Sequence, residues 1–234
     1  MRVYQQSLTH PLTNWQAHCD RLLNSLQTFG WQIPDWQRLQ QGASQLLSFF
    51  PVLRIAIFPD GRELITGRFL PADLQERQQQ GITAMLASQP QWRRDLAAHK
   101  TGNYLAPWLA LQQARQQDTQ EAILVDNQGN WLETSTGNLW GWRDGCWYTP
   151  TLNQGILPGT VRALIINWLQ NSEQNVQENV WDDNFVQTLE AIAYSNSAVE
   201  IVPIHTVVTE QNSFTYKHSV QVMQQLRSFF TELD

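Results

Sequence analysis

Two hydrophobic periods predict the elements of the first third of the chain. Between residues 15 and 29, apolar side chains recur every three or four positions, which predicts a helix that ends at Gly30. A second helix is predicted over residues 35–50. The segments 52–58 and 63–68 are joined by an Asp-Gly turn and predict a β-hairpin. The first third therefore predicts a small unit of two helices and a few strands.

The pattern after residue 100 changes to short strands separated by turns. A helix is predicted over residues 103–116, and three further helices over 159–169, 181–189 and 220–230. Strands are predicted over 121–126, 130–133, 138–143, 146–149 and 198–204. Such a meander is typical of an antiparallel or mixed sheet.

These elements predict an α+β protein of two domains. We expect a small α/β N-terminal domain over residues 1–85 and a larger, mixed-sheet domain over residues 95–234. The boundary between them is predicted within residues 80–95, because a polar connection begins at residue 71. A chain of 234 residues is long enough to bury a core without disulfides or metals.

Composition excludes several classes of protein. Charged residues make up only 15% of the chain and the net charge is −6, which argues against a nucleic-acid-binding surface. Two cysteines form neither a disulfide framework nor a zinc site, and the histidines lack ligand spacing. No secretory signal and no apolar stretch of about 20 residues is present. We therefore expect a cytoplasmic protein without a metal or a membrane partner.

Four polar segments carry candidate chemistry. Lys100 lies before a predicted helix in a nearly uncharged neighbourhood, and Glu133 ends a predicted strand 33 residues later. Residues 157–162 begin a helix at a glycine, where free N–H groups can hold a phosphate. Residues 195–197 form a small polar loop before a strand. Each segment alone also fits a bland alternative: a surface lysine, a paired glutamate, a helix start or a turn.

Taken together and in order, these segments resemble the class IV aminotransferases, which are fold type IV pyridoxal-phosphate enzymes. Residues 18–25 resemble the family's HxxRLxxS helix, and residues 100–105 its KTxNYL-type segment. Residues 133–139 resemble the E-x(4)-N-[LI] signature. The remaining similarities are residues 148–150 with 157–162, which resemble the TP…PGxxR segment, and residues 197–204, which resemble a late [ST]AxEIxPV strand. The similarity covers nearly the whole chain.

The resemblance implies roles for individual residues. Lys100 would form an imine with pyridoxal 5′-phosphate and later accept the proton from the substrate carbon, and an apolar pocket would favour its neutral amine. Glu133 would keep the ring nitrogen protonated. The resemblance places four groups at the phosphate and one near the ring: Arg21, the N–H groups of Thr160 and Val161, Ser197, and Tyr104.

The resemblance also has departures. Relatives often have threonine where Val161 stands, so only a backbone N–H remains there. Family members usually carry about 30 residues more at the front, where this sequence has only Arg2-Val3-Tyr4 before its first helix. Those strands line the substrate side, so we expect this form to be less soluble and less active than one extended upstream.

The function implied by the resemblance has three alternatives. The leading one is a 4-amino-4-deoxychorismate lyase, which converts aminodeoxychorismate to 4-aminobenzoate and pyruvate in folate biosynthesis. The second is a branched-chain or D-amino-acid aminotransferase, which shares the first two steps. The third is a truncated or degenerate member without catalytic activity. For an active form, the resemblance implies a small amine or amino-acid substrate and a homodimer, since each pocket in the family is completed by the neighbouring subunit.

Overall fold

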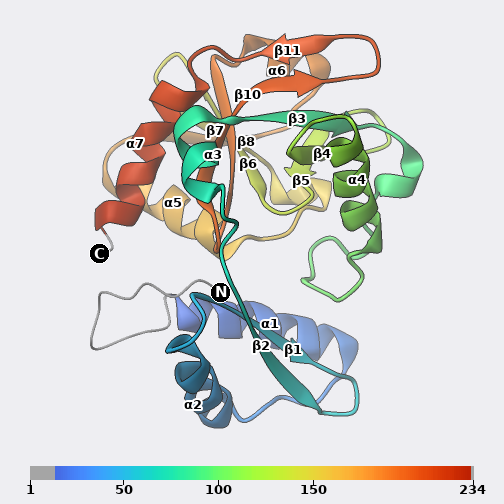
Figure 1. Cartoon of the computed structure of the whole chain (residues 1–234), viewed down its shortest axis with the longest axis vertical. Coiled ribbons are helices and arrows are strands. Elements are labelled where there is room, and N and C mark those ends of the chain that lie inside the picture. The colour runs from blue at the N-terminus through green and yellow to red at the C-terminus, as the bar shows by residue number, and fades with distance from the viewer. Residues whose placement is uncertain (1–13, 233–234) are drawn as a thin grey trace. The chain divides into compact units, whose positions relative to one another are not determined.

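The computed structural model describes residues 14–232, which fall into two compact units (Figure 1). The smaller unit ends at Ala72 and the larger begins at Asp73. This division precedes the boundary predicted over residues 80–95. The reason is that α3 (Leu74–Gln80) packs against a strand of the larger unit, and β3 (Ile82–Ala87) pairs within its sheet. The predicted strand at Arg2-Val3-Tyr4 lies outside the described residues.

The small unit contains two helices and a hairpin, as the sequence predicts. Its elements are α1 (Trp15–Phe29), α2 (Trp36–Leu47), β1 (Val52–Ile57) and β2 (Glu63–Arg68). Helix α1 ends at Gly30, which has a φ of 66° and closes the helix by donating its N–H to the Gln27 carbonyl. The Asp35 carboxylate caps α2 by accepting two backbone N–H bonds. Ala43 and Leu53 form the buried centre of this unit.

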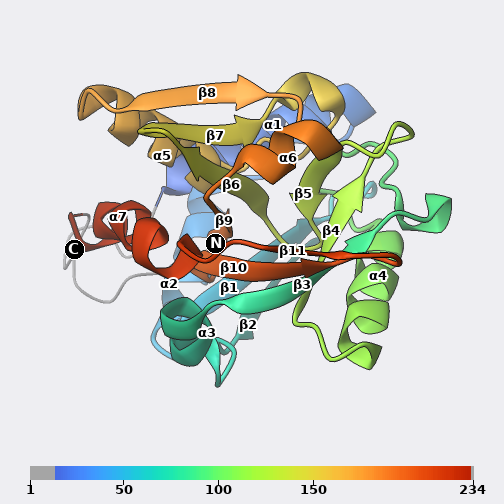
Figure 2. The same cartoon turned by 90° about the horizontal axis from the view of Figure 1, so that it is seen from above.

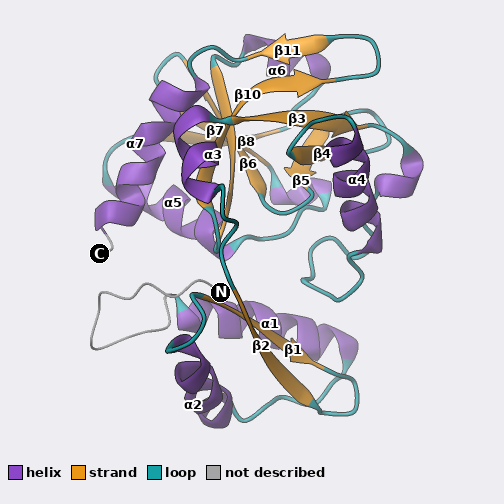
Figure 3. Ribbon diagram, in the orientation of Figure 1, coloured by secondary structure: helices purple, strands orange, loops and turns teal. Residues whose placement is uncertain are grey.

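The large unit is built around a mixed sheet (Figure 3). Its further helices are α4 (Leu105–Gln116), α5 (Thr160–Asn171), α6 (Asp183–Thr188) and α7 (Ser219–Glu232). Its further strands are β4 (Glu121–Val125), β5 (Trp131–Thr134), β6 (Asn138–Arg143), β7 (Cys146–Pro150), β8 (Asn175–Asn179), β9 (Ala191–Asn196), β10 (Glu200–Val208) and β11 (Ser213–Thr215). The α+β class and the mixed sheet of the larger domain are confirmed.

The strand pairings close a ring within this sheet. Strands β3, β4, β5, β6, β9 and β10 each pair with the next, and β10 returns to pair with β3. The pairs β3–β4 and β3–β10 are parallel, whereas the other pairs of the ring are antiparallel. A closed ring leaves no unpaired edge among its members. Strands β7, β8 and β11 extend the sheet outside the ring.

Helices cover the outside of this sheet at two places (Figure 2). Helix α4 packs on β3 and β4, where Ala110 and Ala114 are fully buried. Helix α7 packs on β9 and β10, with α3 beside it. The expectation that tryptophans serve packing is met inside the sheet, where four are almost fully buried: Trp131, Trp140, Trp147 and Trp181. In the described part of the chain, no helix is both long and apolar enough to span a bilayer.

The register of three neighbouring strands positions the candidate chemistry. Glu133 on β5 is paired with Asn138 on β6, and Asn138 is paired in turn with Ser195 on β9. These three residues therefore form one row across the sheet, at the end where β5 and β9 finish and β6 begins. Helix α5 begins at Thr160, and Leu157 just before it is bonded to two residues of this row region.

Candidate active site

The spacing of the E-x(4)-N signature has a direct structural reason. The four residues between Glu133 and Asn138 form the hairpin turn that brings the two residues opposite each other. Both side chains then hold the same peptide segment, because the Leu157 N–H donates to Glu133 Oε2 at 3.1 Å and Asn138 Nδ2 donates to the Leu157 carbonyl at 2.9 Å. The signature thus fixes the loop that leads into helix α5.

The glycine of the PGT segment is required by the same clamp. A Cβ atom on Gly159 would collide with the Asn138 Oδ1 atom. Its φ of −66° is ordinary, so the requirement is for space and not for an unusual backbone. Glycine at this position lets the start of α5 pass close to the Asn138 side chain, and thereby keeps the first turn of the helix beside the Glu133 row.

Glu133 is almost fully buried and forms an ion pair with Arg94. Burial raises the pKa of Glu133 above its ordinary value. The positive charge of Arg94, the Leu157 N–H bond and the positive charge of Lys100 all oppose that rise. A buried carboxylate with these partners can interact strongly with a further positive charge, such as the N–H of a protonated pyridine ring.

Lys100 lies beside Tyr104 on the segment that leads into helix α4. Its Nζ atom is 3.3 Å from the Tyr104 hydroxyl and 5.3 Å from the centre of the tyrosine ring. The guanidinium carbon of Arg94 lies 5.4 Å from the same ring centre. Tyr104 therefore contacts both cations, and it links Lys100 to the Arg94–Glu133 pair.

The expectation of an apolar pocket around Lys100 is not met among the described residues. Lys100 is exposed, because it lies on an irregular segment that leaves the protein surface between His99 and the start of α4. Its neighbours are also not uncharged, since Arg94 lies near and the charge of Lys100 acts on Glu133. Exposure leaves its amine open to a small molecule, but this surface alone does not exclude water from it.

A second group of predicted residues gathers at the start of α5. Thr160 and Val161 are the first two residues of this helix, where N–H groups have no acceptor within the helix. The Thr160 hydroxyl oxygen lies 3.3 Å from that of Ser197, which follows β9. Two hydroxyl groups and a helix N-terminus are a set of donors, and such a set suits a phosphate. With the carboxylate of Glu133, these residues fit the two polar ends of pyridoxal phosphate.

The loop that carries Ser197 is held by its neighbour Asn196. The Asn196 Oδ1 atom accepts the N–H groups of Ala198 and Val199 at 2.8 and 3.0 Å. Its Nδ2 group donates to the Thr136 carbonyl in the β5–β6 turn at 3.1 Å. The polar loop predicted at residues 195–197 is therefore a fixed turn, bonded to the hairpin that follows Glu133.

Arg21 belongs to the small unit and lies on helix α1. Its Nη2 atom is 3.5 Å from the His18 ring nitrogen, one helical turn earlier, so the HxxR pair of the predicted motif lies on one face of the helix. Its predicted contact with the phosphate stays a prediction.

Arg94 is the member of this site that sequence reasoning missed. Its signal was the pair Arg93-Arg94 in a charge-poor chain, six residues before Lys100. The Arg94 side chain is 7% exposed, and its Nε atom is buried without a hydrogen-bond partner in the described residues. A nearly buried arginine is costly unless it is paired, which makes its pairing with Glu133 a structural necessity.

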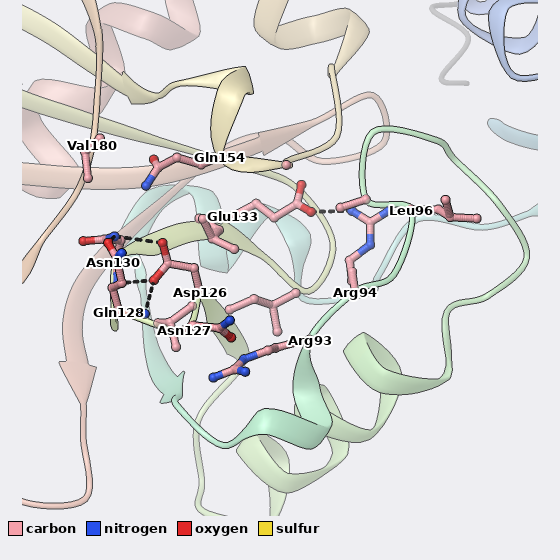
Figure 4. A pocket seen from close by; sticks show the side chains of 15 residues that line it. Arg93, Arg94, Leu96, Asp126, Asn127, Gln128, Asn130, Glu133, Gln154 and Val180 are labelled. Carbon is pink, nitrogen blue, oxygen red and sulfur yellow. Dashed lines mark hydrogen bonds and ion pairs between the residues drawn. The ribbon is translucent and has the colours of Figure 1, made fainter. Parts of the chain in front are cut away.

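A cavity of about 700 Å³ lies on the Arg94 side of Glu133 (Figure 4). Arg93, Arg94, Glu133 and Gln154 are among the residues that line it, whereas Lys100 and the residues at the start of α5 do not. The cavity therefore matches the predicted site only at the Glu133–Arg94 pair. The site is better defined by its donors and charges than by this cavity. Within residues 14–232, no cluster of three potential metal ligands is present.

Comparisons with known proteins agree with this arrangement. The chain is 33% identical over 159 residues to the branched-chain-amino-acid aminotransferase of Escherichia coli K12, covering 65% of this chain and 48% of that protein. It is 25% identical over 227 residues to the aminodeoxychorismate lyase of Vibrio harveyi, covering 88% of this chain and 82% of that protein. The structure of the E. coli branched-chain aminotransferase superposes with a TM-score of 0.80 at 22% identity, covering 99% of this chain and 83% of that one.

The match to the E. coli aminotransferase sequence thus spans about half the length of that relative. The family described as amino-transferase class IV matches residues 1–207, which is most of the sequence. The fold, the ordered motifs and this match lead to one conclusion: the chain belongs to the class IV aminotransferase family.

Proposed function

We propose that this chain binds pyridoxal 5′-phosphate, the cofactor of its family, and uses it to transfer the amino group of an amino acid. The observation that carries the proposal is the shared clamp on Leu157, through which Glu133 and Asn138 join a carboxylate site to the donors at the start of α5. A cofactor with a basic ring nitrogen at one end and a phosphate at the other needs both sites.

When bound, the cofactor supplies an electron sink for the bonds at the substrate carbon. Lys100 provides the amine that attaches the cofactor and then accepts and returns the proton of the substrate carbon. Tyr104 contacts the Lys100 amine and so limits where that amine can move. Thr160, Val161 and Ser197 donate to the phosphate, while Glu133, paired with Arg94, holds a proton on the ring nitrogen.

A branched-chain amino acid is the proposed amino donor. The 33% identity to branched-chain aminotransferases supports it over the lyase activity that the motifs alone favoured. The lyase activity remains the second candidate, because the match to the Vibrio lyase extends over more of both chains. A cytoplasmic location remains a prediction from the sequence.

A paired assay separates the two activities. The purified chain, loaded with cofactor, is given leucine and 2-oxoglutarate in one reaction and aminodeoxychorismate in another. We expect glutamate to form in the first reaction in proportion to leucine consumed, with no 4-aminobenzoate in the second. Release of 4-aminobenzoate and pyruvate without a keto acid would instead assign the lyase activity. Activity in neither reaction, with cofactor bound, would contradict both assignments.

We also propose that the active form is a homodimer. Helix α4, which begins next to Tyr104, exposes three apolar side chains: Leu105 is 63% exposed, Trp108 53% and Leu109 39%. Exposed apolar side chains grouped on one helix are typical of protein interfaces. Sedimentation at micromolar concentration should give twice the 27.0 kDa chain mass, and Trp108→Glu should shift it toward the monomer. A fully active 27.0 kDa species would contradict this.

A further inference from the structure

A second buried carboxylate lies beside the site and has no role in the chemistry above. Glu121 begins strand β4 and is 2% exposed. Among the described residues it forms no ion pair with an arginine or lysine. A carboxylate buried without a cation is costly unless hydrogen-bond donors surround it. The partners of Glu121 therefore indicate what it stabilises.

All of these partners are donors, and two belong to one turn. The Ser135 hydroxyl donates to Glu121 Oε1, and the Thr136 hydroxyl donates to Oε2 at 2.6 Å. The Ala122 N–H donates to Oε1 at 2.9 Å. The Ser135 N–H in addition donates to the Ala122 carbonyl at 2.8 Å. Glu121 and its neighbour thus hold both residues at the tip of the β5–β6 turn.

This turn connects the two sides of the site. Directly before it stands Glu133 and directly after it Asn138, the two residues that clamp Leu157. Its Thr136 carbonyl accepts the Asn196 side chain, which also fixes the loop of Ser197. A shift of the turn would therefore reach the ring-nitrogen carboxylate and the phosphate donors together.

We propose that Glu121 is a positioning residue, which holds the β5–β6 turn through Ser135 and Thr136 and thereby sets the geometry of both ends of the cofactor site. The proposal rests on the proposed function for its effect on the cofactor, but not for its effect on the turn. Burial raises the pKa of Glu121, and the four donor groups around its carboxylate oppose that rise. The same donors that favour its charge are the groups it is proposed to position.

The first test measures hydrogen exchange of the chain without cofactor. Glu121→Leu removes the acceptor at similar volume, and we expect exchange of residues 134–138 and 157–160 to become at least tenfold faster. Met85→Ala is the matched control, because it removes a buried side chain from the neighbouring strand β3 without touching the turn. It should lower the melting temperature and speed exchange generally, without singling out these two segments.

The second test measures the Kd of pyridoxal 5′-phosphate for the same variants. Glu121→Leu should raise the Kd at least tenfold, whereas Met85→Ala should change it less than twofold. Glu121→Gln should stay within threefold of the natural chain, because its amide oxygen still accepts two bonds and its NH₂ group can donate to Thr136. Thr136→Val, which removes one of the bonds, should raise the Kd about threefold and serves if Glu121→Leu does not fold.

The outcomes separate the two proposals. Locally faster exchange with an unchanged Kd would show that Glu121 serves stability only and would overturn the positioning role. Equal effects of Glu121→Leu and Met85→Ala on both measurements would overturn it as well. If the natural chain itself bound no cofactor, the proposed function would fail, and the exchange experiment alone would decide whether Glu121 holds the turn.

Discussion

Replacing Lys100 by alanine should abolish covalent attachment of the cofactor and nearly all turnover. Lys100 supplies both the attaching amine and the group that moves the proton, and proton transfer by a positioned side chain alone contributes about 10²–10⁴-fold. Lys100→Arg should be equally inactive, because a guanidinium stays protonated and forms no imine under these conditions. The cofactor should still bind non-covalently to the donors at the start of α5 in both variants.

The chain offers an unusually clear control for this prediction, because its only other lysine is Lys217. The protein is loaded with cofactor, reduced with borohydride and digested, and the modified peptide is identified by mass spectrometry. The adduct should lie on Lys100 in the natural chain and in Lys217→Ala, and it should be absent from Lys100→Ala. An adduct on Lys217, or full activity of Lys100→Ala, would contradict the assignment.

The sequence predicted the elements whose signals are local. Helix α1 has a strong apolar period and a glycine with positive φ at its end, and both helix and end were predicted. The hairpin of β1 and β2 was marked by an Asp-Gly turn. Helix α3 and strand β8 were missed, because their residues are mostly glutamine, asparagine and glutamate. Their structure depends on neighbours far along the chain, which a local pattern does not contain.

Strand β3 was missed for a different reason. Its six residues form a short apolar run, and such a run does not by itself distinguish a strand from a buried helix or a linker. The structure places it between two parallel partners, β4 and β10, which come 34 and 118 residues later. Because β3 belongs to the ring, the division between the units precedes the one expected from the sequence.

The candidate site shows the same limit. The motifs identified residues whose types the chemistry needs, but not the residues that hold them. Arg94 and Glu121 carry no motif of their own, and their importance follows from burial and from partners 39 and 14 or 15 residues away. Pairing across strands decides such partners, and register is set by the fold as a whole. The exposure of Lys100 was likewise not contained in the charge-poor sequence around it.

Replacing Glu133 by glutamine should leave cofactor binding within a few-fold and remove most turnover. Glutamine has nearly the same shape and can still accept the Leu157 N–H, so the clamp on the α5 loop is retained. It has no charge to hold a proton on the ring nitrogen. If that charge supports the ring pKa by about two units, turnover falls about 10²-fold. Glu190→Gln, an exposed change elsewhere in the large unit, is the control and should be silent.

Arg94→Gln should produce a different signature, which tests the pair and not only the carboxylate. Arg94 opposes the rise in the pKa of buried Glu133, so its removal raises that pKa further, and Glu133 takes up a proton at a higher pH. The acid side of the kcat–pH profile should therefore move to higher pH, and the free energy of unfolding should fall by about 3–5 kcal/mol because a buried charge loses its partner. An unmoved profile in Arg94→Gln, with turnover of Glu133→Gln unchanged, would show that this pair does not act on the ring nitrogen.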